Sequence, residues 1–283
     1  MKQKTKFSRI TKNIPLIIGT FDVLHKGHKK IFDKVKTNEF NVLLVYNSPN
    51  KKEWFHDPLF RAPLIRNKYK QANFYWLNIK KINLSALNFI YFIAKIFLPN
   101  KIIVGSDFKF GKNRTGNVAL LKKYFKVNAI KYNPKYQTSI IKKLYKQGKV
   151  IEANKLLIHK VVYLVGQITK GKGEGKKLGF PTLNVVLDKN QFKFKPGTYA
   201  SICSLKNKDT CFSATCIYND KKRQIAETFV LDRKLKPNQL DDELIIGIIA
   251  YVMPFKKISN SNELIRYIDK SVKAVKEHLK TRL

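Results

Sequence analysis

The chain has 283 residues, and 57 lysines and arginines against 19 aspartates and glutamates give it a formal net charge of +38 at pH 7. A hydrophobic content of 44% is too high for a disordered polycation and is enough to bury a sizeable core. The ordinary counts of 13 glycines and 10 prolines exclude collagen-like and low-complexity proteins. At roughly 100–200 residues per domain, we expect two domains.

Two explanations of the positive charge stay open. A nucleic-acid-binding protein predicts clustered basic residues and a recognition motif, whereas compositional drift gives a solvated, lysine-rich surface. Only eight of the 57 basic residues are arginines, the side chain that phosphates and base edges favour. We find no nucleic-acid recognition motif, so we favour drift and expect no specific nucleic-acid partner. The charge is uneven, because Asp107 is the single acid between residues 58 and 151.

The cysteines and apolar stretches bear on the compartment. Cys203, Cys211 and Cys216 fit neither a paired disulfide framework nor a zinc-binding C-x-x-C pattern, and we expect inert thiols in a reducing compartment. The apolar run before Gly19 is too short for a signal peptide. The most apolar stretch, residues 84–98, is shorter than the ~20 residues that a helix needs to span a bilayer. These features predict a cytoplasmic protein with no membrane partner, and they leave its oligomeric state open.

From residue 15 to about residue 157, short β-rich runs alternate with longer helical patterns. Strands are expected at residues 16–21, 41–46, 74–79, 101–105 and 127–132, and helices at residues 27–36, 59–71, 85–98, 116–125 and 139–157. This alternation is typical of βαβ units and predicts an α/β domain with a doubly wound parallel sheet.

After residue 158 the pattern becomes β-rich, with glycine, proline and asparagine between the runs. Strands are expected at residues 161–169, 198–205, 212–218, 224–231 and 244–253. They predict a small antiparallel β-barrel. A C-terminal helix follows, capped by Asn260 and apolar on one face. The predicted domains are therefore residues 1–157 and 158–283.

The most informative segment is PLIIGTFDVLHKGHKK, residues 15–30. An apolar run ends at Gly19, where the missing side chain leaves room for a ligand beside the backbone, and H-K-G-H at residues 25–28 then opens a helix. N–H groups at a helix N-terminus favour a bound phosphate, and two imidazoles one turn apart can face it together. A zinc pair is the alternative, but no nearby His, Cys or acidic cluster completes a tetrahedral set. The spacing therefore predicts a phosphate site.

This segment resembles the H-x-G-H nucleotidyltransferases, in which the α-phosphate of a nucleoside triphosphate is attacked and pyrophosphate leaves. The resemblance implies that His25 and His28 stabilise the triphosphate in the transition state. Fixed donors suit that reaction because charge develops on the phosphate oxygens. The resemblance also implies nucleotide contacts for Gly19, Thr20, Phe21, Asp22 and Gly27.

A second segment narrows the family. Residues 101–117, KIIVGSDFKFGKNRTGN, resemble the V-G-x-D-F-x-F-G-x-x-R-x-G segment of bacterial bifunctional riboflavin kinase/FAD synthetases. The resemblance implies nucleotide or flavin contacts for Asp107 and Arg114, although an aspartate there also suits a helix cap or a turn. A weaker match at residues 137–142, to the family's S-S-T-x-I-R, implies phosphate contacts for Thr138, Ser139 and Lys142, with lysine where the family has arginine.

Residues 166–184, GQITKGKGEGKKLGFPTLN, resemble the flavokinase signature G-x-V-x-x-G-x-x-x-G-R-x-L-G-F-P-T-A-N. A Walker A loop is the alternative, but Gly173 stands where Ser or Thr is needed. A flexible Gly/Lys hairpin would explain the glycines and not the P-T-L-N. By the resemblance, Thr182 and Asn184 hold Mg²⁺ and the nucleotide phosphates from one face of an extended segment. The resemblance also implies nucleotide or flavin contacts for Gly171, Lys176, Gly179 and Pro181.

Glu227 lies in AETFVLD, residues 226–232, where the family has E-x-H-x-L-D. The resemblance implies that its carboxylate orients or deprotonates the 5′-hydroxyl of riboflavin for attack on the γ-phosphate. Cross-strand pairing with a lysine is the alternative.

The family resemblance implies a bifunctional, cytoplasmic enzyme. Its reactions are phosphorylation of riboflavin by ATP to FMN, and adenylylation of FMN by ATP to FAD and pyrophosphate. ATP, riboflavin and FMN are the expected small-molecule substrates, and Mg²⁺ is the expected cofactor. The nearest alternative is an FMN adenylyltransferase with a non-catalytic flavokinase module, and a second is a basic nucleic-acid-binding protein on a relict enzyme fold.

Overall fold

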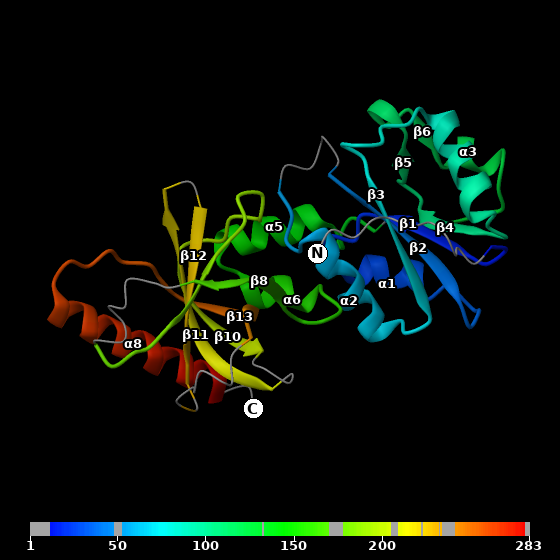
Figure 1. The fold of residues 1–283 in the computed structure, drawn as a ribbon. Helices are drawn as coiled ribbons and strands as arrows, with labels where there is room; N and C mark the ends of the chain where they lie inside the picture. Colours follow the sequence, from blue (N-terminus) through cyan, green and yellow to red (C-terminus); the bar gives the residue numbers. More distant parts are fainter. Residues whose placement is uncertain are drawn as a thin grey trace. The chain divides into compact units, whose positions relative to one another are not determined.

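A computed structural model of the chain describes residues 12–47, 53–131, 133–169, 178–204, 209–221, 223–231, 233 and 241–280. The chain forms two compact units (Figure 1). The first comprises residues 1–52 and 57–137, and the second comprises residues 53–56 and 138–283.

The first unit is built on a parallel five-stranded sheet. Its strands are β1 (Leu16–Gly19), β2 (Phe40–Tyr46), β3 (Ala72–Asn78), β4 (Ile102–Gly105) and β7 (Val127–Ile130). They pair in the order β3-β2-β1-β4-β7, so the chain moves away from β1 in one direction and then restarts on its other side at β4. The first three residues of β1 and of β4 are apolar and fully buried, as a parallel sheet covered on both faces requires.

Helices connect the strands of this sheet. They are α1 (Lys26–Phe32), α2 (Pro58–Lys68), α3 (Ala86–Phe97) and α4 (Val118–Lys122). Each begins where a polar side chain accepts a hydrogen bond from a backbone N–H of the first turn; these side chains belong to His25, Asp57, Ser85 and Asn117. After β4, a small antiparallel ribbon pairs β5 (Lys109–Phe110) with β6 (Gly116–Asn117) around the one-turn helix η1 (Lys112–Arg114).

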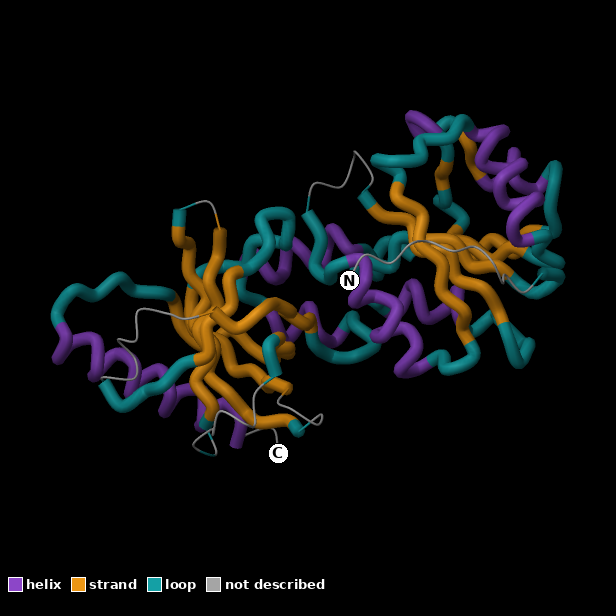
Figure 2. The backbone as a smooth tube through the Cα atoms, in the orientation of Figure 1, coloured by secondary structure: helices purple, strands orange, loops and turns teal. Residues whose placement is uncertain are grey.

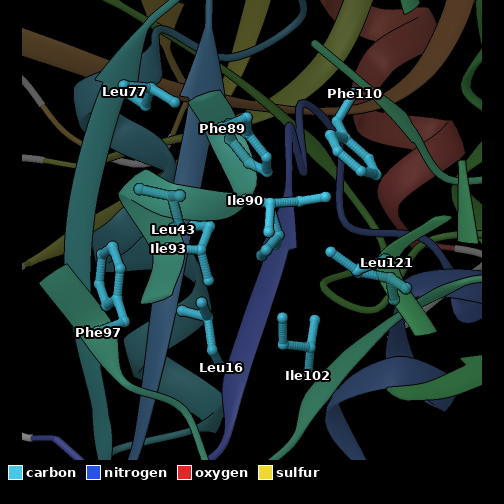
Figure 3. Close-up of a cluster of buried hydrophobic side chains, with 12 residues drawn as sticks. Leu16, Leu43, Leu77, Phe89, Ile90, Ile93, Phe97, Ile102, Phe110 and Leu121 are labelled. Atoms are coloured by element: carbon cyan, nitrogen blue, oxygen red, sulfur yellow. The ribbon is translucent and has the colours of Figure 1, made fainter. Parts of the chain in front are cut away.

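Helix α3 covers one face of the sheet. Its side chains Phe89, Ile90, Ile93 and Phe97 converge on buried residues of the strands (Figure 3). The strand members of this cluster are Leu16, Ile18, Leu43, Leu77, Ile102 and Val104. Alternate strand residues face the opposite side, where α1 and α2 contact β2, β3 and β4. Helices on both faces confirm the predicted doubly wound sheet.

The second unit is a closed antiparallel barrel (Figure 2). Its strands are β8 (Val162–Thr169), β9 (Leu183–Val186), β10 (Gly197–Ser204), β11 (Thr210–Asp220), β12 (Arg223–Val230) and β13 (Glu243–Pro254). They pair in the order β10-β11-β12-β9-β8-β13, and the pairing of β13 with β10 closes the barrel. Closure leaves no unpaired sheet edge. The predicted antiparallel barrel is therefore confirmed.

The C-terminal helix α8 (Ser261–Lys280) covers part of the outer surface of the barrel (Figure 1). It begins at Asn260, whose side chain accepts a hydrogen bond of 3.0 Å from the backbone N–H of Glu263. Its apolar face packs on small side chains of three strands; the cluster is Ala200, Ala214, Ala250, Val272, Val275 and Leu279. Both the predicted cap and the predicted apolar face are confirmed.

The other side chains of these strands point into the barrel. Four of these side chains carry hydroxyl groups, are fully buried and are linked by hydrogen bonds; they are Ser201, Ser213, Thr215 and Thr228. The distances are 2.7–3.0 Å. Each hydroxyl has a partner, so this polar interior carries little desolvation cost.

Residues 53–56 and two helices, α5 (Thr138–Gln147) and α6 (Val150–Lys155), pack as part of the barrel unit. Trp54 forms a parallel bridge with Gln191. The Asn154 amide donates to the carbonyls of Ile248 and Ile249, at 2.9 and 3.1 Å. By packing, residues 138–157 therefore belong with the barrel. The functional boundary at residues 157/158 stays a prediction.

Three local expectations are corrected. The helix predicted at residues 139–157 is two helices, because Gly148 adopts a left-handed φ of 81° and ends α5. The strand predicted at residues 16–21 ends at Gly19, because Phe21 has a left-handed φ of 43°. Strand β9 is absent from the expected strands, although the segment from Thr182 to Asn184 was expected to be extended.

Replacing Leu98 with glycine should stabilise the first unit. Leu98 ends α3 with a left-handed φ of 41°, and its side chain is 57% exposed, so glycine relieves strain and loses little packing. We expect the free energy of unfolding to rise by about 1 kcal/mol. Urea unfolding followed by the fluorescence of Trp76, in a Trp54→Phe background, measures it.

Leu87 provides the matched control, because it is a 46% exposed leucine inside the same helix. Leu87→Gly should lower the free energy of unfolding by about 1 kcal/mol. Equal destabilisation by the two substitutions would contradict the strain at Leu98.

Candidate functional site

The first candidate site lies where β1 and β4 end side by side. These strands are neighbours at the point where the strand order reverses, and open α/β sheets bind ligands at that point, beyond the carboxyl ends of the strands. The segment from Thr20 to His28 follows β1, and Ser106 and Asp107 follow β4. The fold therefore brings two of the segments singled out in the sequence to one edge of the sheet.

His25 and His28 form a stacked pair at the N-terminus of α1. Their ring centroids are 3.7 Å apart and their planes differ by 15°. His25 is the N-cap, and its Nδ1 accepts a hydrogen bond of 3.3 Å from the backbone N–H of His28. The Nδ1 of His28 lies 3.1 Å from the carbonyl oxygen of Val23. The two imidazoles are thus fixed in orientation by backbone groups.

These hydrogen bonds determine which ring nitrogens carry protons. Because Nδ1 of His25 accepts, neutral His25 carries its proton on Nε2 and can donate from that atom. Nδ1 of His28 faces a carbonyl, which only accepts, so that nitrogen carries a proton. His28 consequently donates from Nε2 only as an imidazolium. Together the pair can present two N–H donors and one positive charge to an anion.

Two glycines make room for aromatic rings in this segment. A Cβ on Gly19 would lie 2.5 Å from Cζ of Phe21, and a Cβ on Gly27 would lie 3.0 Å from Nδ1 of His25. Phe21 is buried and stacks edge-on against His28, with ring centroids 5.0 Å apart. The sequence led us to expect open space for a ligand at Gly19. In the structure the side chain of Phe21 fills that space.

Asp22 and Thr20 are held by an arginine of α2. Arg61 donates from Nη1 to the carbonyl oxygen of Thr20 at 2.9 Å, and its Nη2 lies 3.4 Å from Oδ1 of Asp22. Asp22 is 3% exposed and Arg61 is 5% exposed. Burial lowers the pKa of Arg61, and the negative charges of Asp22 and Asp57 oppose that change.

Asp107 lies in the turn after β4, and Arg114 lies in η1, further along the chain. Asp107 is exposed in the turn after the strand, and its carboxylate folds back so that a Cβ on Gly105 would lie 2.8 Å from Oδ1. Arg114 is exposed in η1 with a left-handed φ of 60°. Both side chains are open to solvent, which suits contact with a ligand.

The third predicted segment belongs to the barrel unit. Thr138 and Ser139 open α5, and Lys142 lies one turn further along. Lys142 donates from Nζ to the carbonyl oxygen of Glu53 at 2.8 Å and lies 6.0 Å from the ring centroid of Phe55. Within this unit, Lys142 therefore fastens residues 53–55 to α5.

The second candidate site is on the outer face of the barrel. Asn184 of β9 is paired directly with Glu227 of β12, and Glu227 is paired with Cys216 of β11. Directly paired residues on antiparallel strands point to the same side. Ala214, two residues from Cys216, packs beneath α8, so this side is the outer one. The register therefore brings Asn184 and Glu227 together, 43 positions apart in the sequence.

Glu227 has specific neighbours on this face. The Tyr218 hydroxyl donates to Oε1 of Glu227 at 2.8 Å. Burial, followed by the negative charge of Glu227, raises the pKa of Cys216 to about 12, so this thiol stays protonated. No ion pair among the described residues joins Glu227 to a lysine. The alternative considered from the sequence, in which Glu227 pairs with a lysine across the strands, is therefore not found among the described residues.

Three of the remaining predicted kinase residues directly precede β9. Thr182 is half-buried just before the strand, Pro181 is exposed, and Gly179 adopts a left-handed φ of 86°. Gly171 and Lys176 lie outside the described residues.

The residues present fit a hard cation. The Oδ1 atom of Asn184 is buried and has no hydrogen-bond partner among the described residues. Such an orphaned oxygen on a residue that is 8% exposed is costly unless a ligand satisfies it. The described residues contain no cluster of three His, Cys, Asp or Glu side chains that would hold a metal by themselves. A cation here would need phosphate or water oxygens as further ligands, as Mg²⁺ usually does.

Sequence reasoning missed Arg61 and Tyr218. Arg61 is one of only eight arginines in a lysine-rich chain, which is the one signal that it differs from the solvated basic residues. Nothing in the sequence relates Tyr218 to Glu227, because their contact depends on the register of β11 with β12.

Comparison with known proteins gives one family match for each part of the chain. A family described as FAD synthetase matches residues 8–153, and a family described as riboflavin kinase matches residues 158–279. The chain is 27% identical over 307 residues to a bifunctional riboflavin kinase/FMN adenylyltransferase of Buchnera aphidicola subsp. Schizaphis graminum, with 95% of both chains covered. It is 29% identical over 272 residues to the trifunctional protein RibF/MnmA of Mycoplasmoides gallisepticum, which covers 94% of this chain. The chain spans only 40% of that relative's length.

A solved structure shares the fold. It is described as a macrolide-efflux protein from Streptococcus pneumoniae, has a TM-score of 0.77 and 18% identity, and covers 96% of this chain and 97% of its own. At that identity the likeness concerns the fold alone. In the described part of this chain, no helix has the length and apolar character needed to cross a bilayer.

An α/β nucleotidyltransferase module followed by a small phosphotransferase barrel defines a two-domain flavin-cofactor transferase. The chain belongs to the family of bifunctional riboflavin kinase/FMN adenylyltransferases. Riboflavin, FMN and ATP follow as the substrates of the two activities.

Proposed function

We propose that this chain makes FAD from riboflavin in two steps, with His25 and His28 serving adenylyl transfer and Asn184 and Glu227 serving phosphorylation. The observation that carries the proposal is spatial. The stacked histidines cap a helix at the switch point of the sheet, and the paired Asn184 and Glu227 share one face of the barrel.

In adenylyl transfer, a 5′-phosphate oxygen of FMN attacks the α-phosphorus of ATP, and the bond from that phosphorus to the bridging oxygen breaks to release pyrophosphate. His25 donates from Nε2, and protonated His28 adds a second donor and a positive charge. Both donors are oriented before the reaction, so they stabilise the charge that develops on the triphosphate. Asp107, exposed at the neighbouring strand end, and Arg114, exposed in η1, would contact the nucleotide or the flavin.

In phosphorylation, the 5′-hydroxyl of riboflavin attacks the γ-phosphorus of ATP and ADP leaves. Glu227 accepts the hydroxyl proton, and the hydrogen bond from Tyr218 orients its carboxylate. The Oδ1 atom of Asn184 and the hydroxyl of Thr182 would hold Mg²⁺. When bound, Mg²⁺ neutralises charge on the phosphate oxygens.

The positive charge and the thiols complete the proposal. ATP, FMN and pyrophosphate are anions, and a basic surface raises their local concentration. The three cysteines form no disulfide, and two of them have a raised pKa, about 11 for Cys203 and about 12 for Cys216. Protonated, buried thiols suit the reducing cytoplasm.

Product analysis tests the two activities separately. The purified chain is incubated with ATP and Mg²⁺ and either riboflavin or FMN, and the flavins are separated. We expect FMN and FAD from riboflavin, and FAD from FMN. FAD from FMN with no conversion of riboflavin would identify the barrel as a non-catalytic module, and conversion of neither flavin would overturn the proposal.

His25→Asn separates the capping role of His25 from its catalytic one. Asparagine is a good N-cap and keeps an acceptor for the backbone N–H of His28, but it lacks the Nε2 donor. We expect unchanged thermal unfolding and a fall of about 10²- to 10³-fold in FAD formation from FMN. His28→Ala should reduce this rate comparably. Wild-type rates in either variant would contradict the assignment.

Glu227→Gln should abolish most riboflavin phosphorylation and leave adenylylation of FMN intact. Glutamine keeps the shape and can still accept from Tyr218, but it cannot take a proton, so we expect a loss of about 10²- to 10⁴-fold. Steady-state rates with each flavin measure both activities. Glu243→Gln, at an exposed position at the start of β13, is the matched control and should not change either rate. Full kinase activity in Glu227→Gln would exclude Glu227 as the base.

A further inference from the structure

Arg61 is a buried cation outside the sites that the sequence identified. It lies on α2 and is 5% exposed, and its contacts include the carbonyl oxygen of Thr20 at 2.9 Å and the carboxylate of Asp22 at 3.4 Å. Both partners belong to the segment between β1 and α1 that ends in the stacked histidines. The guanidinium therefore reaches across from one helix to the loop that precedes another.

Stability alone does not account for this ion pair. Removing two charges from water costs free energy, and replacing a buried ion pair with neutral side chains of similar volume is often neutral or stabilising. What the pair does provide is geometry, because the planar guanidinium binds two different oxygens at once. A lysine ammonium carries the same charge on one nitrogen, so it does not reproduce the two separate donor nitrogens of the guanidinium.

The segment that Arg61 holds needs such support. Only five residues lie between Thr20 and the start of α1. One of them, Phe21, adopts a left-handed φ of 43°, which is strained for a residue with a Cβ. Phe21 fills the space above Gly19 and contacts His28. The positions of Thr20 and Asp22 on either side of Phe21 therefore set where the His28 ring lies.

We infer that Arg61 is a positioning residue for adenylyl transfer: its bonds to Thr20 and Asp22 hold the strained Phe21 turn, and through it the His25/His28 pair, in the geometry that receives the triphosphate. This inference rests on the proposed function of the two histidines. We assign Arg61 a positioning role and not a catalytic one, because its guanidinium is buried and bound to the carbonyl oxygen of Thr20 and the carboxylate of Asp22.

The test compares three variants with Arg66→Gln as the control, because Arg66 is an exposed arginine on the same helix. Arg61→Lys and Arg61→Met should each lower kcat for FAD formation from FMN by about 10- to 100-fold, since misplaced catalytic groups act on the chemical step. The KM for ATP should change less than about threefold, as expected when a transition-state interaction is lost. Arg66→Gln should match the wild type.

The double variant Asp22→Asn/Arg61→Met separates positioning from charge compensation. It removes both buried charges together, so thermal unfolding should return to near the wild-type temperature. Asp22→Asn alone is the reference, because Asp22 is itself an expected nucleotide contact. If Arg61 positions the loop, kcat of the stable double variant stays well below that of Asp22→Asn. If Arg61 only balances the charge of Asp22, kcat recovers with stability, and the inference is overturned. Wild-type kcat in Arg61→Lys would overturn it as well, whereas a wild-type chain that makes no FAD would overturn the proposed function instead.

Discussion

The hydrogen bond from the backbone N–H of His28 to Nδ1 of His25 is the interaction on which the first site depends. It begins helix α1, and it also leaves the proton of neutral His25 on Nε2. One contact thus determines a secondary-structure boundary and a tautomer. Because α1 follows β1, the buried central strand, the position of the imidazoles is fixed relative to the centre of the sheet. Local capping and global topology therefore specify the same atoms.

The second site depends on strand register in the same way. Asn184 and Glu227 meet because β9 and β12 are paired with those residues opposite each other. A shift of one residue would turn either side chain into the barrel interior, where buried hydroxyl groups already fill the space. The packing of α8 on small outer residues opposes such a shift. Register, more than any single contact, keeps the carboxylate and the amide on one face.

The sequence predicts the architecture and much of each site, because periodicity and motif spacing are local properties. The sheet, the barrel, the helix that H-K-G-H opens and the cap at Asn260 all follow from such patterns. The pairing of Arg61 with Asp22 and of Tyr218 with Glu227 could not be predicted, since each joins segments that only the tertiary fold brings together. The helix break at Gly148 could have been predicted from the sequence, because glycine commonly ends helices. The space at Gly19 was misread because an aromatic side chain two residues later, and not a ligand, occupies it.

Residues 53–56 have a consequence for the order in which the chain folds. Trp54 bridges to Gln191, and the backbone N–H of Tyr163 donates to Nε2 of His56. During synthesis, Trp54 is therefore made more than 130 residues before Gln191, its bridge partner. The Asn154 amide likewise cannot form its hydrogen bonds until β13 has been made. The barrel also closes only when β13 has been made. Contacts of such high sequence separation fold slowly, because loop closure must be completed before they form. The barrel unit is thus completed only after β13 has been synthesised, and it depends on residues 53–56, which are made before residues 57–137 of the first unit.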